Sequence, residues 1–112
     1  MKTITLSLKR KWFDMIKAGV KKEEYREMKE CWYKRLCREQ NPNQPWLNPM
    51  GGIYFKIRKD FDTLVFTLGY PKKTDTERRM EFKNPKIRIG TGRPEWGAEH
   101  GKLYFVISWD KE

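Results

Sequence analysis

A chain of 112 residues has room for one compact domain, residues 1–112, and for no second one. With 38% hydrophobic residues and no long apolar span, the composition excludes a membrane-spanning protein, and a net charge of +10 favours polyanionic partners. Two cysteines six positions apart and one histidine lack the spacing of common zinc sites, so we expect no metal, no cofactor and a cytoplasmic protein with reduced thiols.

The beginning of the chain predicts a strand followed by a helix. Residues 3–8 alternate polar and apolar side chains, which places the apolar ones on one face of a strand. Residues 9–18 change to the helical period, with Trp12 and Phe13 on the apolar face. Gly19 then suits the left-handed position just past a helix end.

Residues 21–38 admit two interpretations. Their apolar side chains recur at spacings of three and four, so periodicity alone accepts one long helix. Alternatively, residues 21–26 form a short strand or extended turn, and a second helix starts near Lys29. Glu24 and Arg26 then share one face of the strand. Because that face holds no aliphatic residue, it must meet water or line a polar cleft.

The rest of the chain predicts mainly strands. Residues 40–52 have the Asn, Pro and Gly content of a loop. Segments with the composition or alternation of strands follow this loop: 53–57, 63–70, 78–83, 86–90 and 103–109. Strands outnumber helices, and the helices come early, so we expect a small α+β barrel with helices packed on it.

One short motif follows the first helix. Gly19, Lys21, Glu24 and Arg26 form the pattern Gly-x-Lys-x-x-Glu-x-Arg. This pattern resembles the signature of ASCH domains, which are small mixed β-barrels of the PUA-like superfamily with two or three helices packed on the barrel. The motif lies in the first quarter of the chain, and the later run of strands is similar to the family only in kind. The resemblance implies a cleft between barrel and helices that suits RNA or a modified nucleotide or nucleoside.

The three charged residues of the motif also indicate binding by their own chemistry. A Glu24 held beside Arg26 stays ionised and accepts hydrogen bonds from an amine or a base edge, while Lys21 and Arg26 donate to phosphate or carbonyl oxygens. Residues 1–59 hold 15 Lys and Arg against 6 Asp and Glu, so the motif lies in the basic half of the chain. Our first hypothesis is a nucleic-acid-binding module with a basic cleft. A plain charged turn is the alternative explanation.

The resemblance also raises an enzymatic alternative. Some ASCH relatives are amidohydrolases that remove an acyl group from a modified cytidine such as N4-acetylcytidine, using a Lys, a Thr and a Glu. The Thr of those enzymes corresponds to Glu24, and a carboxylate cannot donate the proton of a hydroxyl, which argues against this activity. An enzyme would use Lys21 as base with a pKa lowered by burial, Glu24 as its partner, and Glu77 or Glu81 as third member. A protein-interaction domain with an acidic partner is a further alternative.

Two other segments supply candidate binding residues. In the glycine-rich loop 90–97, Trp96 either plugs one end of the barrel or stacks on a base while Arg93 meets a phosphate. This loop lacks the third glycine of a dinucleotide fingerprint. On the predicted second helix, Tyr33 and Arg35 extend a basic rim toward the cleft.

Overall fold

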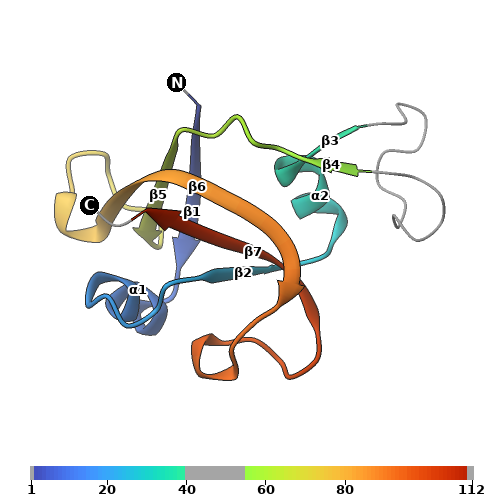
Figure 1. The fold of residues 1–112 in the computed structure, drawn as a ribbon. Helices are drawn as coiled ribbons and strands as arrows, with labels where there is room; N and C mark the ends of the chain where they lie inside the picture. The colour runs from blue at the N-terminus through green and yellow to red at the C-terminus, as the bar shows by residue number, and fades with distance from the viewer. Residues whose placement is uncertain (1, 40–54, 111–112) are drawn as a thin grey trace.

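The computed structural model describes residues 2–39 and 55–110, whose arrangement is shown in Figure 1. The predicted loop at 40–52 and the start of the strand predicted at 53–57 lie outside the described residues. The described elements are β1 (Thr3–Leu8), α1 (Arg10–Lys17), β2 (Glu24–Glu27), α2 (Glu30–Leu36), β3 (Cys37–Glu39), β4 (Phe55–Ile57), β5 (Thr63–Leu68), the 3-10 helix η2 (Thr76–Arg78), β6 (Arg79–Thr91), the 3-10 helix η3 (Pro94–Trp96) and β7 (Leu103–Asp110).

Five strands form one mixed sheet in the order β1-β5-β6-β7-β2. β1 pairs with β5 in parallel, and the other neighbouring pairs are antiparallel. β3 and β4 form a separate antiparallel pair. The predicted α+β class is therefore confirmed. The sheet is open, however, with β1 and β2 as its edges, so strand pairing among the described residues does not close the predicted barrel.

The hydrophobic core combines one face of β1 with residues of both helices, β5 and β7. The alternation predicted for residues 3–8 is confirmed, because the apolar side chains of β1 are buried. Phe13 comes from α1, and Phe66 and Phe105 come from the centre of the sheet. A buried aromatic side chain removes about 150–250 Å² from water, so a few rings supply much of the core of this small domain.

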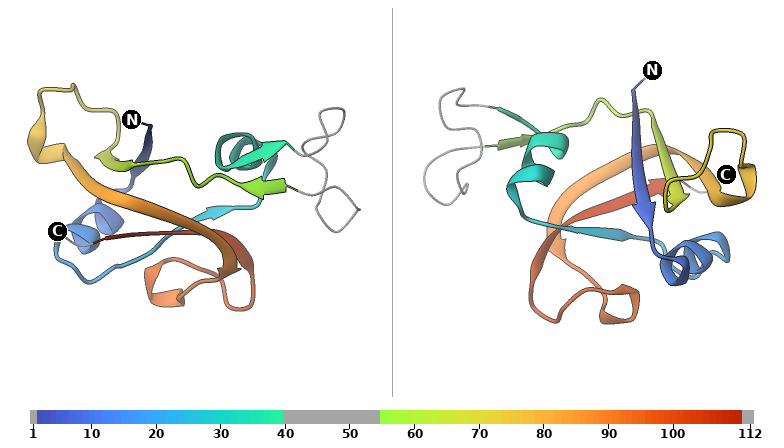
Figure 2. Two further views of the ribbon diagram at one scale, coloured as in Figure 1. Left: turned by 45° about the horizontal axis from the view of Figure 1, so that its top comes forward. Right: turned by 180° about the vertical axis from the view of Figure 1, so that it is seen from behind.

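The segment between the helices follows the second of the two interpretations. Gly19 ends α1 with φ of +77°, as predicted, and Lys29 is the N-cap of α2. Between them, β2 pairs with β7, with Tyr25 opposite Val106. The single helix over residues 21–38 is therefore wrong, because this segment gains more from completing the sheet than from its weak helical period. β2 runs from the region of α1 to that of α2 (Figure 2).

Two boundaries differ from those expected. α2 ends at Leu36, so Arg38 belongs to strand β3 and not to the second helix. The strands predicted at 78–83 and 86–90 are parts of one long strand, β6. A shift in the register with β7 and a positive φ of 53° at Asn84 mark the point where this strand is interrupted. Such a bulge bends a strand, and β6 is visibly curved in Figure 1.

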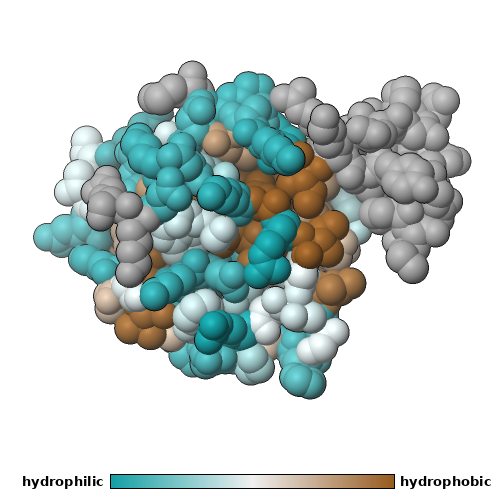
Figure 3. All heavy atoms as spheres, viewed as in Figure 1, coloured by the Kyte–Doolittle hydropathy of each residue, from teal (hydrophilic) through white to brown (hydrophobic). Residues whose placement is uncertain are grey.

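The face of the molecule seen in Figure 3 is largely hydrophilic. Charged and polar residues cover most of the face in Figure 3, around a smaller hydrophobic area. This agrees with a chain in which 36% of the residues are charged. Within residues 2–39 and 55–110, each helix is too short or too polar to cross a membrane.

Candidate functional site

The structure brings together the three charged residues of the motif. Glu24 Oε1 lies 2.5 Å from Lys21 Nζ, and Glu24 Oε2 lies 3.1 Å from Arg26 Nη2. The side chains of Lys21, Glu24 and Arg26 are 0%, 8% and 20% exposed. A carboxylate is thus held between two cations in a largely buried cluster, which is not the exposed charged turn of the alternative explanation.

The end of α1 positions Lys21. The backbone N–H groups of Val20 and Lys21 both donate to the Met15 carbonyl oxygen, at 3.0 and 3.1 Å. The ammonium group of Lys21 then lies 5.1 Å from the ring centroid of Trp12 and 5.5 Å from that of Tyr25. Burial lowers the pKa of Lys21, while Glu24 opposes this shift. The two ring faces and the carboxylate compensate for the loss of water around the charge.

Arg26 links the two edges of the open sheet. Its Nη2 donates to the carbonyl oxygen of Ser7 on β1 at 3.0 Å, while Arg26 itself lies on β2. Arg35 of α2 donates to the carbonyl oxygen of Thr5, two residues earlier on the same edge strand, at 3.0 Å. Both guanidinium groups lie over the ring of Trp32, at 5.0 and 4.8 Å. Side chains thus satisfy acceptors that edge strand β1 leaves unpaired.

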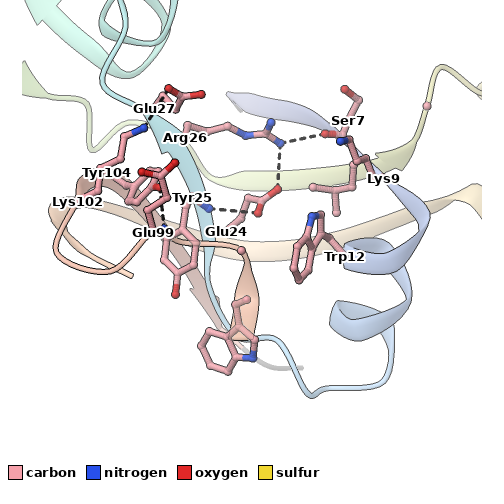
Figure 4. Close-up of a pocket in the computed structure, with 14 residues that line it drawn as sticks. Ser7, Lys9, Trp12, Glu24, Tyr25, Arg26, Glu27, Glu99, Lys102 and Tyr104 are labelled. Atoms are coloured by element: carbon pink, nitrogen blue, oxygen red, sulfur yellow. Dashed lines mark hydrogen bonds and ion pairs between the residues drawn. The ribbon is translucent and has the colours of Figure 1, made fainter. Parts of the chain in front are cut away.

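A cavity of about 550 Å³ opens between β1, α1, β2 and the chain that precedes β7 (Figure 4). Glu24 and Arg26 point into it from β2, toward Ser7 and Trp12. The other lining residues are Leu8, Lys9, Tyr25, Glu27, Gly69, Trp96, Gly97, Glu99, Lys102 and Tyr104. Four aromatic rings, three carboxylates and three cations are present in this lining. Its charge is balanced, so it differs from the basic cleft predicted.

Glu24 retains one unused position as a hydrogen-bond acceptor. Its Oε1 accepts from Lys21 Nζ and from the backbone N–H of Tyr25, whereas Oε2 accepts, among the described residues, from Arg26 alone. A carboxylate oxygen accepts two hydrogen bonds, so Oε2 can take one more. Nη2 of Arg26 already donates twice, and the described residues provide no acceptor for its Nη1. The pair therefore offers one acceptor and one donor group side by side.

The other predicted binding residues have different positions. Trp96 lines the cavity, and the guanidinium of Arg93 lies 5.0 Å from its ring, outside the lining. Arg35 is exposed, and its guanidinium lies 4.8 Å from the ring centroid of Trp32, outside the lining of the cavity. The prediction that Tyr33 extends a basic rim is wrong. Tyr33 is buried, because it lies on the face of α2 that packs on Phe105, with ring centroids 5.2 Å apart.

Neither of the two glutamates predicted as the third member of an active site, Glu77 and Glu81, lines the cavity. Glu77 lines a separate hollow between α1 and η2, and Glu81 pairs with Lys83 on β6. The carboxylates that line the cavity besides Glu24 are Glu27 and Glu99. Glu27 lies on β2 itself, whereas sequence reasoning missed Glu99 because strand alternation does not say which loop reaches that strand.

Trp12, Lys102 and Tyr104 were also missed as cavity residues. The helical period placed Trp12 on the apolar face of its helix, and it is in fact half-buried at the cavity wall. Tyr104 lies opposite Glu27 in the pairing of β2 with β7, and Lys102 pairs with Glu27 at 3.3 Å. The position of Trp12 on the helix that leads into the motif was the one available signal.

Comparison with protein-family models, with curated proteins and with solved structures gave no match. Across residues 2–39 and 55–110, no three His, Cys, Asp or Glu side chains come close enough to hold a metal ion.

We expect Gly97→Ala to lower the free energy of unfolding by about 1–3 kcal/mol. Gly97 has a φ of +100°, and a Cβ there would lie 2.9 Å from Cζ2 of Trp12 across the cavity wall. Urea unfolding followed by Trp fluorescence measures the loss. Gly101→Ala is the matched control, because Gly101 also has a positive φ, +76°, but open space around it. Equal losses in the two variants would contradict a tight contact with Trp12.

Proposed function

We propose that this protein binds RNA or a modified nucleotide or nucleoside, and that the cavity beside Glu24 and Arg26 holds the base. The observation that carries the proposal is the pair itself. A buried carboxylate with one free acceptor position stands next to a guanidinium with a free donor group, at the wall of an aromatic-lined cavity of about 550 Å³. Ligand sites in proteins typically have volumes of about 300–1,000 Å³.

A nucleobase matches this arrangement in shape and polarity. The edge of a base presents N–H donors beside nitrogen or oxygen acceptors, which a carboxylate and a guanidinium can pair in one plane. Trp96 and Tyr25 supply ring faces for stacking, the usual way in which unpaired bases are bound. The balanced charge of the lining favours a neutral base inside the cavity over a phosphate group.

We also propose that the sheet is an open form of the PUA-like barrel of an ASCH domain. The resemblance of the motif supports this, as does the contact from Arg26 to Ser7 O, which holds β1 and β2 near each other without backbone pairing. In this proposal the motif has two roles. Arg26 joins the edges of the barrel, and Glu24 faces the ligand.

One observation favours the enzymatic alternative, because burial lowers the pKa of Lys21 as a general base requires. Against it, the Lys21 side chain is 0% exposed, and Lys21 is not among the lining residues of the cavity. We therefore infer that Lys21 positions Glu24 and does not act as a base. Incubation with N4-acetylcytidine should then release no acetate. Release of acetate by the protein, lost in Lys21→Ala, would contradict this inference and support the enzymatic alternative.

A thermal-shift panel of nucleosides, acylated cytidines and short single-stranded RNAs tests the binding proposal. We expect one class to stabilise the protein by about 2–3 kcal/mol at a hundredfold excess over its Kd. Trp96→Ala should weaken that ligand about 5- to 100-fold through lost stacking. Trp96→Phe, which keeps a ring at the cavity wall, is the matched control and should retain most of the affinity. A panel without any stabilising compound, or equal affinity in Trp96→Ala, would contradict the proposal.

A further inference from the structure

The excess positive charge of this protein lies outside the cavity, and part of it gathers on one neighbouring surface. No carboxylate among the described residues lies within 4 Å of the ammonium groups of Lys17, Lys72 or Lys73, and none of these three residues lines the cavity. Lys17 is the last residue of helix α1, and Lys72 and Lys73 follow β5 in the turn that leads to η2. This turn and α1 lie on the same side of the molecule (Figure 2).

An exposed aromatic residue connects the cavity lining to this surface along the chain. Tyr70 is 96% exposed. It follows directly after Gly69, a lining residue of the cavity, and two positions after Leu68, which lines the hollow between α1 and η2. Consecutive Cα atoms lie about 3.8 Å apart, so the backbone of Tyr70 adjoins a residue of the cavity lining.

We propose that the ligand is a base within a single-stranded polynucleotide, that its neighbouring base stacks on Tyr70, and that the phosphates beyond it contact Lys72 and Lys73. This inference rests on the proposed function of the cavity. It adds the direction in which the strand leaves the cavity and the groups that bind its backbone.

The chemistry of the surface favours a polynucleotide over an acidic protein. Exposed large hydrophobic residues in the described chain are Val20, Tyr70, Ile89 and Leu103. Tyr70 is thus the exposed large apolar group of the turn, and the surface lacks the apolar centre of a typical protein interface. A single ring among unpaired ammonium groups is instead what a strand of alternating bases and phosphates requires.

Fluorescence anisotropy with a labelled nine-nucleotide single-stranded RNA tests the inference. The RNA should bind at least 10-fold more tightly than the matching nucleoside. Tyr70→Ala should weaken RNA binding about 5- to 100-fold. Lys72→Gln with Lys73→Gln should reduce the slope of log affinity against log salt by about 1.4, since each phosphate contact contributes about 0.7 for single strands. Neither change should alter nucleoside binding.

The control is the double variant Lys59→Gln with Lys86→Gln, which removes the same charge from the rim of a different hollow. An equal loss of RNA affinity in this control would overturn the inference, as would an RNA that binds no better than its nucleoside. Displacement of the RNA by polyglutamate at equal charge would assign an acidic protein instead and would also overturn it. A single-stranded DNA of the same sequence that binds equally well supports recognition of base and phosphate.

The two proposals fail in different ways. If the RNA binds and depends on Tyr70 but not on Trp96, the proposed function of the cavity is wrong. If a nucleoside binds in a manner that depends on Trp96, while Tyr70→Ala leaves RNA affinity unchanged, the cavity proposal stands and the path of the strand is wrong.

Discussion

Replacement of Glu24 by Gln is expected to lower the free energy of unfolding by about 3–5 kcal/mol. The substitution keeps the size of the side chain but removes the charge that pairs with Lys21 at 2.5 Å. Because the Lys21 side chain is 0% exposed, its ammonium group cannot recover the lost interaction from water. Urea unfolding followed by Trp fluorescence measures the change.

Two variants serve as controls for Glu24→Gln. Glu27→Gln changes an exposed glutamate of the same strand and should leave the urea midpoint nearly unchanged. Lys21→Met combined with Glu24→Gln should recover part of the loss, because no unpaired charge then remains buried. If Glu24→Gln were as stable as Glu27→Gln, the carboxylate would not be what keeps Lys21 in the interior.

The same variant has a characteristic dependence on pH. Glu24 raises the pKa of Lys21 against the effect of burial, so its removal moves this pKa further below the ordinary value of 10.5. Between the two values the unfolded chain binds more protons than the folded one, and the free energy of unfolding therefore rises with pH. The deficit of Glu24→Gln should therefore shrink as the pH rises toward the ordinary lysine pKa of 10.5. Above that value Tyr25 interferes, since burial raises its pKa to about 12 and folding then opposes its ionisation.

Arg26→Met is expected to cost about 2–4 kcal/mol of unfolding free energy and to abolish ligand binding in the cavity. The variant loses the bond to Ser7 O and the pairing with Glu24 Oε2 together, although Met fills much of the same space. Urea unfolding and the nucleoside panel measure the two losses. Hydrogen exchange should also show faster opening of β2, whose side-chain link to β1 is gone.

Arg35→Met is the matched control for this second variant. Arg35 also donates to a β1 carbonyl, at 3.0 Å from Thr5 O, and also lies on Trp32, but it is exposed and does not line the cavity. Its loss should be small and should leave ligand binding intact. Equal effects of the two changes would mean that any cation on this edge of the sheet serves as well as Arg26.

The sequence located the charged cluster of the motif but misplaced Tyr33 and Glu77, and this difference has a physical cause. The cluster of Lys21, Glu24 and Arg26 depends on neighbours in sequence: a glycine that ends a helix and an extended segment that turns alternate side chains to one face. Tyr33 was misplaced because the buried face of a short helix depends on what packs against it. Glu77 was misplaced because its distance from the cavity depends on how a later turn folds over α1.

Local patterns in the chain were sufficient for the α+β class, the first strand and helix, the turn at Gly19 and the cluster of charges around Glu24, because each depends on residues a few positions apart. The order of the strands, the open edges joined by Arg26 and the cavity wall contributed by Trp96, Glu99 and Tyr104 required the folded structure. These features depend on backbone pairing between β2 and β7, which are far apart in the chain, and periodicity within one segment contains no information about its partner.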